Sequence, residues 1–266
     1  MSPELMFWFV LSTKMAVTAA FVTIATIIAE RLGAVVGALV ATLPVSAGPV
    51  YVFLALDHDR SFISSSALAS LALNGATAIY ITVYVLIAQR RSMRFSVSLA
   101  FATWLAAVLV LSPVHWNVWS ASILNFVVFA ACVFIVQPFC LVPMPPTTRS
   151  WYDFVIRASL AASLVGAVVT LSYQIGPTGS GVLAVFPVIY TSIMVILHYR
   201  VGGPATAAVL ANAVPGLAGF GVALLTLHLT AVPLGSATAL IVALGVSVAW
   251  NAIVYAIRRR QAREVA

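Results

Sequence analysis

Residues 42–49 read Thr42-Leu43-Pro44-Val45-Ser46-Ala47-Gly48-Pro49, and this stretch decides the fold. It lies within a long apolar segment, and two prolines flank its glycine. Because proline cannot donate a backbone hydrogen bond and clashes with the preceding turn, the stretch predicts an interrupted helix. The backbone groups released at such a break need partners, and at membrane depth they are tolerated only against protein or a wet cavity.

The same pattern returns later in the chain as Val185-Phe186-Pro187-Val188-Ile189-Tyr190-Thr191-Ser192. We call the sequence separation between Pro44 and Pro187 the repeat offset, because other positions recur at it. Trp8 and Lys14 return as Trp151 and Arg157, and Gly33, Ala41, Pro44 and Val45 return as Gly176, Ala184, Pro187 and Val188. The chain is therefore predicted to consist of two related halves.

The composition excludes a soluble globular protein. Hydrophobic residues make up 63% of the chain and charged residues 7%, whereas soluble domains are about half apolar. The 13 basic residues outnumber the 6 acidic ones, but they lie in short runs between apolar segments, so no nucleic-acid partner is predicted. Cys132 and Cys140 lie too far apart on one helix to form a disulfide. The sequence predicts a multi-pass membrane protein whose first partner is the lipid bilayer.

Segments of about 17 to 25 apolar residues can span the hydrocarbon core, and the sequence contains nine of them. They run over Leu5–Ala29, Leu32–Leu56, Phe62–Ala88, Phe95–Leu111, Val118–Val142, Phe154–Tyr173, Gly181–Leu197, Ala205–Leu227 and Leu234–Ile257. The predicted fold class is therefore all-α, with nine transmembrane helices.

The basic residues between these segments predict the orientation, because cytoplasmic loops collect Lys and Arg. Only Arg60 falls on one side of the predicted membrane. The other side carries Arg31, Arg90, Arg91, Arg94, Arg149, Arg200, Arg258, Arg259, Arg260 and Arg263. This distribution predicts an outer amino terminus and a cytoplasmic carboxyl terminus.

Nine crossings and the repeat predict three parts: a first four-helix repeat over 1–112, a linking helix and loop over 113–149, and a second repeat over 150–266. With an odd number of crossings between matching positions, the second repeat enters the membrane from the opposite side. Inverted repeats of this kind form their substrate site at the repeat interface, near the bilayer midplane.

Lys14 and Arg157 are the two basic residues within crossings. Lys14 lies six residues after Trp8, which places it about 9 Å deeper than an interfacial aromatic anchor and about 6 Å from the midplane. One interpretation is that both side chains face a cavity; the alternative is that they extend to the nearest interface. All acidic residues fall at helix ends or in loops, so nothing is expected to balance the two cations. This pattern favours an anionic ligand.

The broken helices and one mid-helix amide complete the candidate site. The alternatives for these residues are a simple proline kink and hydrogen bonding between neighbouring helices. The predicted substrate-binding residues are Lys14, Arg157, Pro44, Ser46, Gly48, Pro187, Thr191 and Asn74.

No nucleophile with a base, carboxylate pair, metal motif or phosphate loop is visible, so we expect no enzyme activity, no metal and no cofactor. The sequence predicts a secondary transporter or exchanger of a small anionic solute that works by alternating access. Two alternatives stay open: an anion channel and a non-transporting membrane binding or assembly protein. The sequence does not indicate an oligomeric state.

In general plan the chain resembles inverted-repeat secondary transporters. The run Leu43-Pro44-Val45-Ser46-Ala47-Gly48-Pro49 resembles one in an uncharacterised family of bacterial integral membrane proteins. This resemblance implies neither an activity nor a substrate. The absence of an organelle-targeting segment favours the bacterial inner (cytoplasmic) membrane.

Overall fold

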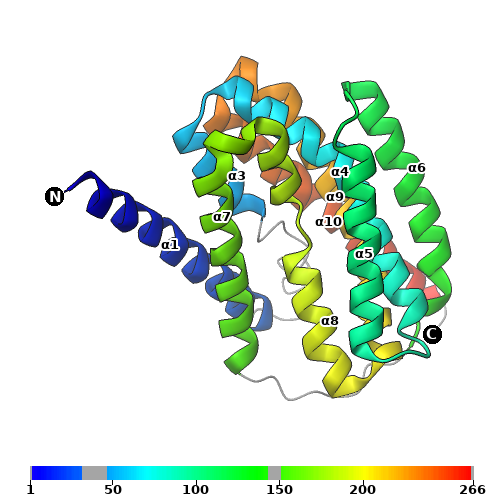
Figure 1. Cartoon of the computed structure of the whole chain (residues 1–266). Helices are drawn as coiled ribbons and strands as arrows, with labels where there is room; N and C mark the ends of the chain where they lie inside the picture. The colour runs from blue at the N-terminus through cyan, green and yellow to red at the C-terminus, as the bar shows by residue number, and fades with distance from the viewer. Residues whose placement is uncertain (1, 32–46, 143–150, 265–266) are drawn as a thin grey trace.

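The computed structural model describes residues 2–31, 47–142 and 151–264, and every regular element in these ranges is a helix (Figure 1). The expected all-helical fold is confirmed. The elements are α1 (Pro3–Arg31), α3 (Ala47–Asp57), α4 (Arg60–Ile87), α5 (Met93–Leu111), α6 (Val118–Val136), the 3-10 helix η1 (Gln137–Phe139), α7 (Trp151–Ala184), α8 (Val188–Val201), α9 (Gly203–Leu234) and α10 (Ser236–Glu264).

Local signals account for several helix ends. The Asp59 carboxylate accepts a hydrogen bond from the backbone N–H of Phe62 and caps the start of α4, as short acidic side chains do at helix amino ends. Gly202 and Gly235 have φ of 82° and 86° and are the single residues between α8, α9 and α10. Because only glycine adopts this conformation without strain, consecutive helices reverse direction over one residue.

The centre of the bundle is α4, which contacts α5, α6, α7 and α9. Most of its residues are buried, including the large side chains of Tyr80 and Tyr84. Small residues allow neighbours to approach closely: a Cβ on Gly181 of α7 would clash with the Ser66 carbonyl oxygen of α4. Such close contacts between helices are typical of packing inside membranes.

Seven helical ranges in the described residues are long and apolar enough to cross a membrane. They are Glu4–Ala25, Arg60–Ile87, Met93–Leu111, Val118–Phe139, Tyr152–Val201, Gly203–Leu234 and Ser236–Ile257. The range Tyr152–Val201 covers two of the nine expected crossings. The expected crossing Leu32–Leu56 is represented by α3, a shorter apolar helix, while its first part lies outside the described residues.

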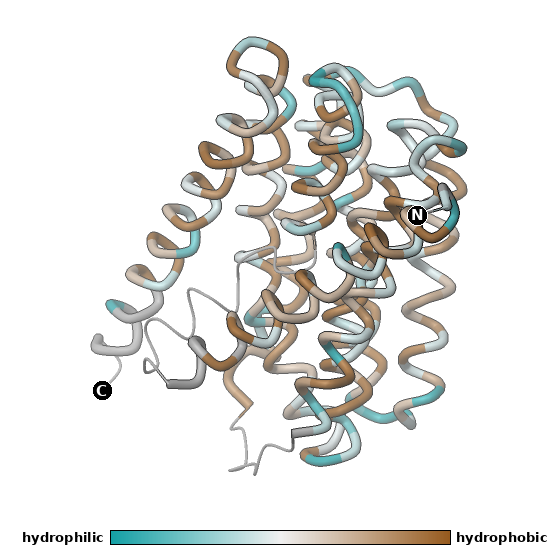
Figure 2. The backbone as a smooth tube through the Cα atoms, turned by 90° about the vertical axis from the view of Figure 1, so that its left-hand side faces the viewer, coloured by the Kyte–Doolittle hydropathy of each residue, from teal (hydrophilic) through white to brown (hydrophobic). Residues whose placement is uncertain are grey.

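Apolar residues cover the outside of the bundle as well as its core. On α6, Trp119, Phe126 and Phe134 are each more than 70% exposed. Figure 2 shows hydrophobic residues along the lengths of the helices and hydrophilic ones concentrated near the turns. Helices that are apolar on both their inner and outer faces suit a membrane and not water.

Matching helices of the two halves begin at the spacing found in the sequence. The first residues of α4 and α9 are Arg60 and Gly203, which are separated by the repeat offset. The first residues of α5 and α10 are Met93 and Ser236, which are separated by the same offset. These two pairs of helix starts therefore share the spacing found in the sequence.

Candidate functional site

The helical chain is interrupted between α7 and α8, at residues 185–187. Pro187 precedes the first residue of α8 and lacks a helical conformation. The prediction of a break at this proline is confirmed. The matching residues Pro44 and Ser46 lie outside the described residues, and α3 begins directly after them at Ala47.

Side chains from α4 bind the backbone at this break. Thr77 Oγ1 donates a hydrogen bond to the Val185 carbonyl oxygen at 3.1 Å. Thr191 Oγ1 donates to the Pro187 carbonyl oxygen at 2.7 Å and lies 2.8 Å from the Tyr80 hydroxyl. Because the Thr191 proton is used on Pro187, Tyr80 is the donor to Thr191. The predicted residue Thr191 therefore lies at the break, with its hydroxyl bound by protein groups.

The contacts continue along α4 toward the part of α7 that follows Gly176, whose φ of 65° and ψ of −171° form a kink inside this helix. Ser66 Oγ donates to the Pro177 carbonyl oxygen at 2.9 Å, and Ser70 Oγ donates to that of Gly181 at 2.7 Å. The Tyr51 hydroxyl of α3 lies 2.6 Å from Ser70 Oγ. We call Ser66, Ser70, Thr77 and Tyr80 the α4 hydroxyl ladder. It supplies the partners that a broken helix needs where water is excluded.

Sequence reasoning missed this ladder. Its four residues lie at spacings of four, seven and three, which bring side chains onto neighbouring positions of one helix face. A hydroxyl stripe in an otherwise apolar helix was therefore a detectable signal, although the carbonyl groups that it binds were not.

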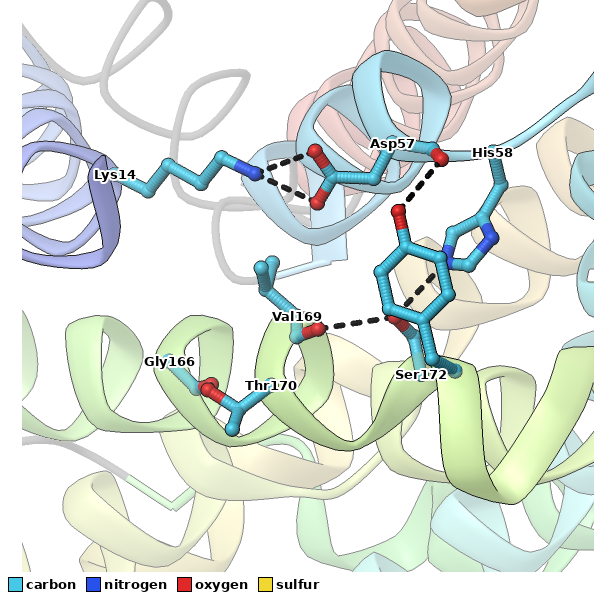
Figure 3. A network of polar contacts seen from close by, with 8 residues as sticks. Lys14, Asp57, His58, Gly166, Val169, Thr170 and Ser172 are labelled. Carbon is cyan, nitrogen blue, oxygen red and sulfur yellow. Dashed lines mark hydrogen bonds and ion pairs between the residues drawn. The ribbon is translucent and has the colours of Figure 1, made fainter. Parts of the chain in front are cut away.

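Lys14 forms an ion pair, contrary to the expectation that nothing balances it. Its Nζ lies 2.6 Å from both carboxylate oxygens of Asp57, the last residue of α3 (Figure 3). The side chains are only 11% and 20% exposed. The expectation was wrong because it treated a helix-end acid as a loop residue. In the fold, the end of the short helix α3 lies against α1.

The end of α3 is also joined to α7. The Tyr173 hydroxyl donates to the Asp57 carbonyl oxygen at 3.0 Å, and His58 Nε2 lies 2.8 Å from Ser172 Oγ (Figure 3). The His58 ring stacks on Phe62 at 3.8 Å between ring centres. Partial burial lowers the pKa of His58 below its ordinary value of 6.5, against the opposite effects of Asp57 and Asp59.

A second ion pair joins α7 to α8. Arg200 contacts Asp153 through two parallel hydrogen bonds of 2.6 and 2.8 Å. This bidentate arrangement is the strong form of an arginine–carboxylate pair. Arg200 is the residue that corresponds to Asp57 at the repeat offset. Asp57 and Arg200 therefore carry opposite charges at corresponding positions, although their partners Lys14 and Asp153 do not correspond.

Arg157 is half-buried on α7, one turn after Asp153. Met15, next to Lys14, packs against α7 at Gly166, where a Cβ would lie 3.0 Å from the methionine sulfur. Gly166 is nine residues beyond Arg157, which is about 14 Å along a helix. Arg157 and the point where Met15, the neighbour of Lys14, contacts α7 therefore lie at different levels along this helix.

Asn74 is fully buried on α4, and its Nδ2 donates to the Leu217 carbonyl oxygen of α9 at 3.3 Å. Nearby, Asn125 of α6 donates to the Leu71 carbonyl oxygen at 2.7 Å. These bonds join α4, α6 and α9, as expected for amides that connect neighbouring helices. The Asn74 side chain of α4 therefore bonds α9, whereas Thr77 of the same helix bonds the break.

Gly48 lies at the start of α3 and lines an apolar cavity of about 350 Å³ between α1, α3, α9 and α10. The structure therefore separates the predicted site residues, with Asn74 bonded to α9 and Arg157 on α7. Pro187 and Thr191 lie at the break, Lys14 lies in an ion pair, and Gly48 lies on the cavity. Within the described ranges, no cluster of three or more His, Cys, Asp or Glu is arranged to hold a metal ion.

Comparison of the chain with protein families, curated proteins and solved structures finds no match. The fold itself defines the class: an all-helical protein with several helices able to span a membrane. The break and the ion pairs are the features of the fold that bear on its function.

Proposed function

We propose that the protein is a secondary transporter or exchanger of a small anionic solute, working by alternating access in the bacterial inner membrane. The observation that carries the proposal is the interruption between α7 and α8, which lies against α4 in the centre of the bundle. Secondary transporters commonly build their sites from discontinuous helices at the interface of inverted repeats. The matched starts of α4 and α9, and of α5 and α10, support such a repeat.

The two ion pairs suit the moving parts of this mechanism. Lys14–Asp57 joins α1 to α3, and Asp153–Arg200 joins α7 to α8. Both connect the first helix of a half with the second. In an alternating cycle, we expect the pair of one half to open while the pair of the other stays closed.

Lys14 is the proposed contact for the anion, which competes with Asp57 for the ammonium group. An anion that replaces the Asp57 carboxylate also removes the link between α1 and α3. The solute then binds more tightly when α1 and α3 are separated than when the Lys14–Asp57 pair joins them. This difference in affinity is what allows a ligand to drive a conformational change.

Uptake by proteoliposomes tests the proposal, with radiolabelled phosphate, sulfate, succinate and pyruvate as the solutes. We expect one of them to show saturable uptake and counter-exchange. Lys14→Ala should lower that uptake about tenfold or more, because a charge-assisted contact is lost. Asp57→Asn should instead lower KM about fivefold, because the competing charge is removed.

Arg90→Ala, at an exposed position after α4, is the control and should transport normally. Flux that rises linearly without counter-exchange would identify a channel. Normal uptake in Lys14→Ala, or equal losses in Lys14→Ala and Asp57→Asn, would contradict the proposed role of the lysine.

A further inference from the structure

The apolar cavity beside α3 is a feature of the fold that the proposed function does not use. Its volume is about 350 Å³, within the range of small-molecule sites. Its inner wall includes Ala223, Leu224 and Leu227 of α9, all at most 4% exposed. Other lining residues come from α1, α3 and α10: Val17, Thr18, Phe21, Gly48, Ile241 and Leu244.

Small residues line the cavity at positions that correspond, at the repeat offset, to large side chains elsewhere in the chain. Where α4 meets α8, Tyr80 is buried and bonds Thr191. The residues that correspond to these two at the repeat offset are Ala223 and Gly48, and both line the cavity. Likewise Tyr190 corresponds to Ala47, a third lining residue. Tyrosines and a threonine thus fill the contact between α4 and α8. The corresponding residues of α9 and α3 leave a cavity.

The described lining residues offer hydrocarbon contacts, and their two side-chain hydroxyls are already bound. Thr18 Oγ1 donates to the Lys14 carbonyl oxygen, and the Tyr51 hydroxyl bonds Ser70. A Cβ on Gly48 would meet nothing within 4 Å. Apolar cavities of this kind stay dry and accept apolar ligands.

The cavity opens toward the surroundings of the bundle. Val17 and Phe21 of α1, Val52 of α3, and Ile241 and Leu244 of α10 are lining residues that are between 46% and 72% exposed. In a membrane, these side chains face lipid hydrocarbon. The lipid hydrocarbon at the opening is therefore apolar, like the lining of the cavity.

One end of the cavity is marked by charge. Lys14 lies one turn before Val17 and Thr18 on α1, and its Nζ is 5.8 Å from the centre of the Phe53 ring, another lining side chain. An amphiphile in the cavity would therefore find a charged group at this end. An apolar cavity with a charged group at one end matches a lipid, whose apolar acyl chain is joined to a polar head group.

We propose that this cavity binds an acyl chain of a bilayer phospholipid. The chain enters between α1 and α10, reaches the buried wall of α9, and fills the space that Tyr80 and Thr191 occupy at the matching contact. The proposal does not depend on the transported solute, since it rests on the cavity, its lining and the charge at one end.

Photolabelling in lipid nanodiscs tests it. The probe is phosphatidylglycerol with a diazirine in the middle of one acyl chain, and adducts are mapped by peptide mass spectrometry. We expect adducts on residues 223–227 of α9, where the lining side chains are buried away from bulk lipid. Exposed Phe126 and Phe134 of α6 report the labelling from bulk lipid in the same sample.

The double variant Gly48→Thr/Ala223→Tyr copies the Thr191–Tyr80 pair into the cavity. It should lose the α9 adducts and keep those on α6. Gly245→Thr adds the same side chain at an exposed position of α10 with nothing within 4 Å, and should label like the wild type. Gly48→Leu is a second filling variant in case the double variant does not fold.

Absence of α9 adducts in the wild type, or their persistence in the filled variants, would overturn the proposal. Labelling of α9 by a diazirine fatty acid but not by the phospholipid would also overturn it, in favour of a free amphiphile. Native mass spectrometry gives an independent measurement. The wild type should retain one phospholipid through delipidation, and retention of none would count against the site.

Discussion

The carboxylate of Asp57 determines what Lys14 can bind. Both of its oxygens lie 2.6 Å from the ammonium nitrogen, and both side chains are largely shielded. Removing one member of such a shielded pair leaves the other charge without compensation, which is more costly than replacing both. An external anion therefore has to replace Asp57 at Lys14 before it gains this contact.

His58 is the titratable residue next to this pair. Asp57, Asp59 and Lys14 act on it electrostatically, while Ser172 bonds its ring and Phe62 stacks on it. Its pKa lies below the ordinary value of 6.5 because burial disfavours the charged ring. The folded protein therefore holds this histidine neutral under conditions where the unfolded chain begins to protonate it.

This shift predicts a loss of stability on acidification. Below 6.5, the unfolded chain binds a proton that the folded chain does not, so the contribution of His58 is complete above 6.5 and decreases as the pH falls toward its folded pKa. The melting temperature in detergent should therefore fall between about pH 7.5 and about pH 5 more in the wild type than in His58→Gln. Equal decreases in the two proteins would contradict this assignment.

At the scale of elements, α4 acts as the support of the broken helix. Its hydroxyl ladder binds carbonyl groups before the break and, through Thr191, the first turn of α8 after it. Helices α7 and α8 are therefore both bonded to α4 in this structure, although the chain between them is not helical. Any movement of the break has to replace these hydrogen bonds.

Thr77→Val tests the ladder with little change of shape. Loss of the hydroxyl leaves the Val185 carbonyl oxygen without this donor and should lower the free energy of unfolding by about 1 to 3 kcal/mol. Thr82→Val is the matched control, because buried Thr82 on the same helix bonds the Ala78 carbonyl oxygen of its own helix. Unfolding in mixed micelles gives the measurement. An equal loss of unfolding free energy in the two variants would show that the Thr77–Val185 hydrogen bond contributes no more than a hydrogen bond within one helix.

At the scale of the whole molecule, one member of each ion pair falls at the repeat offset. Asp57 and Arg200 correspond to each other, and each binds the opposite charge on another helix. Their partners do not correspond, because Lys14 matches Arg157 and Asp153 matches Val10. A second difference is that Ala223 and Gly48 line a cavity, whereas the corresponding residues Tyr80 and Thr191 bond each other.

The predicted orientation can be tested with single cysteines in a Cys132→Ala/Cys140→Ala background. Arg60 and Arg90 lie at opposite ends of α4 and are exposed. With an outer amino terminus, Arg60→Cys should react with a membrane-impermeant maleimide on intact cells, and Arg90→Cys only after permeabilisation. His115→Cys, in the turn between α5 and α6, should label like Arg60→Cys. The reverse pattern would invert the topology.

Several parts of the site were predictable from residues alone. Pro187 interrupts its helix because proline lacks the N–H donor and its ring clashes with the preceding turn, although α9 continues through Pro215. The partner of Lys14 was not predictable, because Asp57 is far away in the sequence and is brought near only because α1 and α3 both pack on α7. Thr191 was correctly associated with the break, but its partner Tyr80 depends on how α4 crosses α8. Pro44 and Ser46 stay predictions.

The amino-acid sequence by itself determined the helical class, the apolar spans, the spacing of the repeat and the break at Pro187. These properties follow from composition, periodicity and the covalent structure of proline, which act within short stretches of chain. Only the tertiary structure decided that Lys14 is paired, that α4 binds the broken helix, and that Ala223 and Gly48 leave a cavity. Those properties depend on which surfaces meet, and this is set by packing between residues far apart in the chain.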